Sequence, residues 1–132
     1  MIRPSLFLRR ALLADAIFSG ISAVLLTAGA EVLAPLFDLP EALLRETGLF
    51  LIAYTALVGW LATRPSVPKA LIMLVVAGNA VWTLVSFALL LSGAVSPNVF
   101  GEIAVVAQAI ATGIFAELQY MGLRRSAGVV AA

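Results

Sequence analysis

The chain has 132 residues, of which 63% are hydrophobic and only 11% are charged. Soluble domains carry about 25% charged residues, so this composition does not supply a water-exposed surface. A net charge of +1 favours neither nucleic acid nor an acidic partner, and the absence of cysteine and histidine excludes disulfides, zinc sites and imidazole catalysis. We therefore expect one integral membrane domain over residues 1–132, without a catalytic site, metal or cofactor.

The first predicted membrane span covers residues 8–33 and contains a carboxylate in its apolar part. The stretch "ALLADAIFSGISAVLLTAGA" lies between Arg10 and Glu31 and has about the length needed to cross the hydrocarbon core. Basic residues before it and "AGA" at its end also fit a cleavable secretory signal. Asp15 interrupts the apolar run, which is long for a signal, so we favour a membrane span.

Three further spans are predicted at residues 42–63, 69–92 and 98–123. The charge-free run from 70 to 101 is too long for one helix, and the turn residues of "SGAVSPN" divide it. The connections are short, so sequential spans should be antiparallel and adjacent. The sequence therefore predicts an all-α membrane protein, an antiparallel four-helix transmembrane bundle.

Capping residues predict where the second, third and fourth spans begin. Asp38, three residues before Glu41, resembles a capping box. Ser96 directly precedes Pro97, and Ser66 lies two residues before Pro68 in the first turn, as is typical of a helix start.

The basic residues predict the orientation of the bundle. Seven of the eight lysines and arginines lie in the N-terminal segment, the second connection or the C-terminal tail, whereas Arg45 lies in an acidic first connection. Lys and Arg near span ends stay on the cytoplasmic side of a membrane. We therefore expect both termini in the cytoplasm and a single orientation.

Two acids are predicted inside the membrane at similar depth, Asp15 in the first span and Glu117 in the fourth. Asp15 shares a helical face with Ser19, and Glu117 shares one with Tyr120. Intramembrane acids usually turn inward and find partners, so we expect both to form ion pairs at the cytoplasmic rim. The candidate partners are Arg9, Arg10, Arg64 and Arg124. A structural ion pair is the favoured interpretation, and a proton- or cation-responsive site is the alternative.

A second polar set is predicted near the bilayer midplane around Asn79. Its amide must find a hydrogen-bond partner there, and Gln108 and Thr112 on the fourth span are the expected partners. Hydrogen bonding between helices is the favoured role, and a polar ligand site between the third and fourth spans is the alternative. Trp82 is expected to be a packing residue.

The segments "LRRALLADAIFSG", "NAVWTLVSFALLLSG" and "AELQYMGLRR" resemble a group of small bacterial four-span membrane proteins with no assigned activity. The resemblance implies only the fold and a bacterial origin, and together with the predicted spans we expect the bacterial inner membrane. "LLADAIFSG" is also superficially similar to the acid-bearing first helix of small multidrug transporters. The long acidic first connection, the one-sided charge and Glu117 depart from that family.

These observations favour a non-enzymatic scaffold or accessory subunit, associated with the lipid bilayer and with itself or a larger membrane complex. The alternative is a small oligomeric proton-coupled transporter in which Asp15 and Glu117 carry protons and Asn79 and Gln108 line a path. A lipid-modifying enzyme that uses carboxylates at the inner interface is a third class.

Overall fold

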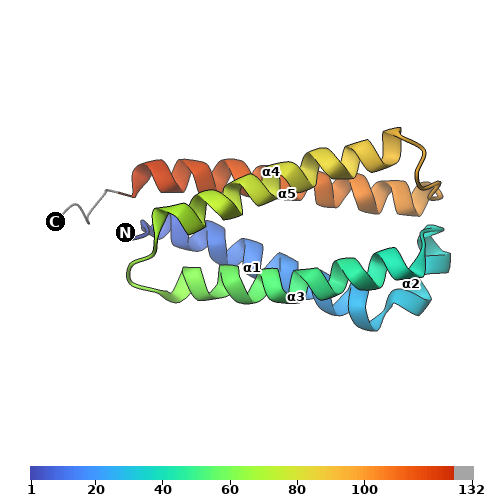
Figure 1. Cartoon of the computed structure of the whole chain (residues 1–132), viewed down its shortest axis with the longest axis horizontal. Helices are drawn as coiled ribbons and strands as arrows, with labels where there is room; N and C mark the ends of the chain where they lie inside the picture. Colours follow the sequence, from blue (N-terminus) through green and yellow to red (C-terminus); the bar gives the residue numbers. More distant parts are fainter. Residues whose placement is uncertain (127–132) are drawn as a thin grey trace.

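In the computed structural model, the described residues, 1–126, form four long helices and one short one. Their bounds are α1 Leu6–Ala28, α2 Ala30–Phe37, α3 Glu41–Thr63, α4 Lys69–Leu91 and α5 Val99–Arg125. The four long helices are long and apolar enough to cross a membrane. They run up and down, so that α1 begins and α5 ends at one end of the bundle and α2 lies at the other (Figure 1). The predicted all-α four-helix bundle is confirmed.

Helices α3, α4 and α5 coincide closely with the second, third and fourth predicted spans, but the first predicted span is divided at Gly29. The Gly29 N–H still bonds the Leu25 carbonyl of α1, yet a Cβ at Gly29 would lie 2.6 Å from that oxygen. The chain therefore turns at a glycine and continues as α2. Asp38, in a left-handed conformation with φ of 55°, ends α2.

The helix starts differ from the predicted caps. Ser5 caps α1 by accepting from the Leu8 N–H, and Asn98 caps α5 by accepting from the Gly101 N–H. Helices α3 and α4 begin after Pro40 and Pro68, which are extended and provide no side-chain cap. The predicted caps Asp38, Ser66 and Ser96 are therefore wrong.

The helices associate as two antiparallel pairs, α1 with α3 and α4 with α5, and α1 also packs along α5. The backbones of α3 and α4 approach each other at few points, although Phe50 of α3 and Trp82 of α4 stack between them, so these sequential spans are neighbours that pack loosely. The segment before α1 crosses the end of the bundle where α3 is connected to α4. There, Ile2 and Val67 exchange two backbone hydrogen bonds of 2.8 and 2.9 Å. It thereby occupies the space beside the α3–α4 connection.

Close helix approach depends on two glycines. A Cβ on Gly122 of α5 would lie 2.7 Å from the Leu8 Cα of α1, and a Cβ on Gly48 of α3 would lie 2.7 Å from the Thr27 nitrogen of α1. Both distances are too short for any side chain. Glycine therefore allows α1 to touch both neighbours backbone to backbone.

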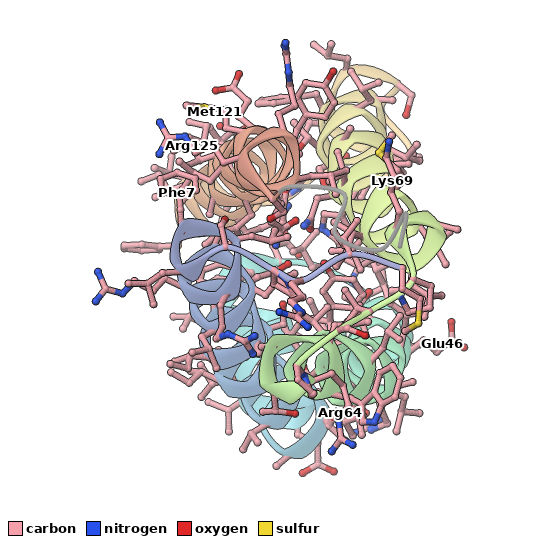
Figure 2. The ribbon with its side chains drawn as sticks, turned by 90° about the vertical axis from the view of Figure 1, so that its left-hand side faces the viewer. Phe7, Glu46, Arg64, Lys69, Met121 and Arg125 are labelled. Atoms are coloured by element: carbon pink, nitrogen blue, oxygen red, sulfur yellow. The ribbon has the colours of Figure 1, made fainter. Side chains whose placement is uncertain are left out.

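The apolar core fills the end of the bundle where α1 begins and α5 ends, which we call the terminal end. Figure 2 looks onto this end, where Arg64, Lys69 and Arg125 lie around the rim. The buried residues behind the rim are Ile2, Leu8, Leu12, Val58, Leu61, Ala62, Val67, Ile72, Val75 and Leu123. A smaller cluster of Ala30, Leu39 and Leu44 lies at the α2 end. The terminal end is therefore solidly packed.

Candidate functional site

Asp15, in the third turn of α1, is fully buried and accepts hydrogen bonds from side chains of all four long helices. The Ser19 hydroxyl donates to Oδ1 at 2.9 Å. Three groups donate to Oδ2, namely Tyr54 Oη at 2.6 Å, Asn79 Nδ2 at 3.0 Å and Gln119 Nε2 at 2.7 Å. Asn79 Nδ2 also donates to Gln119 Oε1 at 2.9 Å. We call these five residues the Asp15 network.

All four donors in the Asp15 network are neutral. The ion pairs predicted between Asp15 and arginine are wrong: among residues 1–126 the only ion pair joins Arg45 to Glu41, exposed at the start of α3. The carboxylate lies deeper than the arginines and is satisfied by hydroxyl and amide hydrogens. A buried charge needs such hydrogen bonds, because desolvation is costly.

The arginines named as candidate partners bind elsewhere. Arg9 donates to the backbone carbonyls of Ala62 at 2.6 Å and Arg64 at 3.1 Å, at the end of α3. The Arg64 and Arg124 guanidinium groups lie over the rings of Trp60 and Tyr120 on their own helices. Arg10 is exposed. These arginine side chains therefore make their contacts at the rim of the bundle and not in its interior.

Glu117 is exposed, so the expectation that it faces inward with Asp15 is wrong. Tyr120 and Arg124 are exposed as well, which means that this predicted face of α5 is turned outward. The interior position is Gln119, two residues from Glu117 and therefore on roughly the opposite side of the helix. The amide, and not the second acid, meets Asp15.

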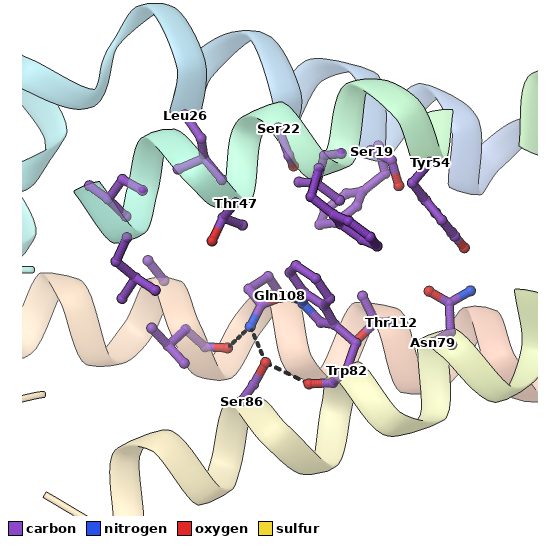
Figure 3. A pocket seen from close by; sticks show the side chains of 18 of the residues that line it. Ser19, Ser22, Leu26, Thr47, Tyr54, Asn79, Trp82, Ser86, Gln108 and Thr112 are labelled. Atoms are coloured by element: carbon purple, nitrogen blue, oxygen red, sulfur yellow. Dashed lines mark hydrogen bonds between the residues drawn. The ribbon is translucent and has the colours of Figure 1, made fainter. Parts of the chain in front are cut away.

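Gln108 is not the partner of Asn79, so this expectation is wrong. It accepts from the Trp82 indole N–H at 2.7 Å and donates to Ser86 Oγ at 3.0 Å, as Figure 3 shows in part. Thr112 pairs with Thr83 at 2.8 Å. Trp82, expected only to pack, thus also joins α4 to α5 by a hydrogen bond.

A cavity of about 530 Å³ lies between the α1–α3 pair and the α4–α5 pair, on the α2 side of the Asp15 network (Figure 3). Its wall is mostly apolar and includes the aromatic rings of Phe18, Phe50, Tyr54 and Trp82. Ser19, Tyr54 and Asn79 of the network also form part of the wall, whereas Asp15 lies behind them. The cavity thus ends at groups that contact a buried carboxylate.

Both ends of the cavity are covered along the bundle axis. The packed core closes the terminal end. At the other end, Asn98 ties α2 to the start of α5, since its side-chain nitrogen donates to the Leu36 carbonyl at 2.8 Å and its backbone N–H to the Phe37 carbonyl at 3.1 Å. Phe37 and Leu39 line the cavity beneath this link. An opening along the axis is therefore absent from the described part of the chain.

The cavity opens sideways between α3 and α4. Only four of its lining residues are exposed, Phe50 and Ala53 on α3 and Leu74 and Gly78 on α4. The backbones of these two helices approach each other at few points. The Phe50 and Trp82 rings stack across the opening with centroids 5.7 Å apart and an angle of 15°. In a bilayer, this lateral opening would face lipid.

Sequence reasoning missed the roles of Tyr54 and Gln119. Both are polar residues within apolar spans, and that feature is the signal that could have identified them as hydrogen-bonding groups of the interior. Within residues 1–126, no group of three or more aspartates and glutamates is arranged to hold a metal ion. No protein-family model, curated protein or solved structure matches the chain.

Proposed function

We propose that this protein binds a lipophilic molecule that enters its cavity from the bilayer. The observation that carries the proposal is the lateral opening between α3 and α4, which leads to a mostly apolar cavity of about 530 Å³. Sites for small organic ligands are typically about 300–1,000 Å³, apolar, and supplied with a few polar groups that fix orientation. The Asp15 network provides such groups at the deep end.

The proposed location is the inner membrane of a bacterium, with the termini in the cytoplasm. The support is the rim of Arg64, Lys69 and Arg125 at the terminal end (Figure 2) together with the excess of basic residues in the segments that reach that end. In this orientation the packed core occupies the cytoplasmic half and the cavity occupies the outer half. The ligand would then enter from the outer leaflet.

A binding role is compatible with the favoured non-enzymatic class. In that class the protein is an accessory subunit that presents its ligand to a second copy of the chain in an oligomer or to a larger membrane complex. Copurification with such a complex would support this role.

The second candidate is a small proton-coupled transporter, favoured by one observation: Asp15 lies directly behind the cavity wall. Transport predicts pH-dependent flux in liposomes that Asp15→Asn abolishes.

The chain offers its own reporter for a binding test. It has two tryptophans, and Trp82 lines the cavity whereas Trp60 does not. A Trp60→Phe variant in lipid nanodiscs would be titrated with a brominated alkane, because bromine quenches tryptophan at short range. Binding predicts quenching of Trp82 that saturates. Partition into lipid alone predicts quenching that rises in proportion to the alkane.

Two glycines give a matched pair of cavity variants. A Cβ on Gly78 or on Gly59 would meet nothing within 4 Å, so either helix accommodates a larger residue, but only Gly78 lines the cavity. In the Trp60→Phe background, Gly78→Leu should weaken saturable quenching and Gly59→Leu should leave it unchanged. Equal behaviour of the two variants, or quenching without saturation, would contradict the proposed function.

A further inference from the structure

The deep end of the cavity shows a consistent direction of hydrogen bonding. Ser19, Tyr54 and Asn79 all form part of the cavity wall, and all three donate to Asp15. The remaining side-chain N–H of Asn79 is directed at Gln119 Oε1. A hydroxyl or amide whose hydrogens are committed has only acceptor oxygen to offer a ligand.

The Asn79 side chain shows this directly. Figure 3 places its oxygen on the cavity side and its nitrogen away from it. Among the hydrogen bonds of the described residues, its Oδ1 accepts none. The carboxylate thus orients the polar groups in front of it so that acceptor atoms are left at the deep end.

The charged residues around the cavity also favour a ligand group that donates hydrogen bonds. No lysine or arginine lines it, so the anionic head of a ligand would find no basic partner there. The Asp15 carboxylate has no cation among its hydrogen-bond partners, and its field acts at short range through a low-dielectric interior. A positively charged donor at the deep end would satisfy both the acceptors and the charge.

We infer that the ligand is a lipophilic amine, whose ammonium head binds at Ser19, Tyr54 and Asn79 and whose hydrocarbon body extends toward the Phe50–Trp82 stack. This inference rests on the proposed function. An aminophospholipid carries the same ammonium group but brings a phosphate for which the wall has no basic partner. The chemistry therefore selects a simple alkyl amine over such a headgroup.

The test is a competition in the same nanodiscs, with displacement of the brominated alkane from Trp82 as the readout. The competitors are dodecylamine, dodecanol, dodecanoate and phosphatidylethanolamine. A charge-assisted hydrogen bond network predicts that dodecylamine displaces the probe at a concentration about tenfold lower than dodecanol does. Dodecanoate and phosphatidylethanolamine should be weaker than the alcohol.

Two variants test whether the preference for the amine over the alcohol depends on the Asp15 network. Asp15→Asn should remove most of the advantage of the amine over the alcohol. Thr47→Val is the matched control, because Thr47 lines the cavity but makes no hydrogen bond to the Asp15 network. It should leave the advantage intact. Should Asp15→Asn not fold, the ranking of the four competitors on the otherwise unchanged chain decides the question.

The outcomes separate the two claims. Saturable alkane binding with equal displacement by amine and alcohol, or with stronger displacement by dodecanoate, overturns the amine assignment and leaves the proposed function standing. Stronger displacement by phosphatidylethanolamine than by dodecylamine overturns it in favour of a lipid headgroup. Absence of saturable alkane binding overturns the proposed function itself.

Discussion

Replacing Tyr54 by phenylalanine tests whether Asp15 is held by helices distant from its own. The change removes one hydroxyl, which donates to Asp15 Oδ2 at 2.6 Å, and leaves the ring that stacks with Phe50. Asp15→Asn removes the charge from the acceptor with little change in shape. The two single variants and the double variant form a thermodynamic cycle that isolates the coupling between the two side chains.

The expected coupling follows from the geometry. Hydrogen bonds to charged groups contribute about 1.5–3 kcal/mol to protein stability. Interhelical hydrogen bonds in membranes average about 0.6 kcal/mol and reach about 1.7 kcal/mol, because the unfolded chain in the membrane also finds partners. For a short bond to a buried carboxylate we therefore expect a coupling of about 1–2 kcal/mol, or roughly a 5- to 30-fold change in the unfolding equilibrium constant.

The assay is reversible unfolding in mixed micelles with an increasing fraction of denaturing detergent, followed by circular dichroism. Tyr120→Phe is the control, because Tyr120 is exposed and its hydroxyl makes no hydrogen bond to a described residue. It should change the free energy of unfolding little. Additive effects of Tyr54→Phe and Asp15→Asn, with no coupling, would refute the reasoning.

Three further predictions concern packing and orientation. Gly122→Ala should destabilise the bundle by about 1–3 kcal/mol in the same unfolding assay, because its Cβ would overlap Leu8, whereas Gly113→Ala should be nearly neutral since its nearest neighbour is 3.4 Å away. Arg9→Leu should cost about 1 kcal/mol, because the last carbonyls of α3 lose their donor; a stability unchanged within error would contradict this role. Reporter fusions at the two chain ends should locate both on the cytoplasmic face, and opposite faces would contradict the proposed orientation.

The sequence predicted the helical architecture well because the apolar runs and their punctuation are local signals. The turn at "SGAVSPN" lies where α4 gives way to α5. The pairing of helices was less accessible, because short connections indicate neighbours but do not reveal that α3 and α4 part around a cavity. The split at Gly29 was missed because apolar residues continue past it to Phe37, interrupted only by Glu31 and Pro35.

The candidate site was predicted in part. Asp15, Ser19 and Asn79 were singled out and meet in one network. Glu117 was chosen for its charge, but its position on α5 turns it outward, and the neutral Gln119 takes the interior place. Helical periodicity groups the residues of one face but does not state which face is buried when a helix is apolar on all sides. Only the packed structure supplies that choice.

The central claim is that the cavity is open to the bilayer between α3 and α4. A photoreactive alkane dissolved in the native membrane tests it directly, since carbene insertion marks every side chain that lipid reaches. The account predicts labelling of Leu44 and Ser86, which are buried but line the cavity, and protection of Leu12 and Ile72 in the packed core. Equal protection of all four residues, with label only on the outward faces of the helices, would contradict it.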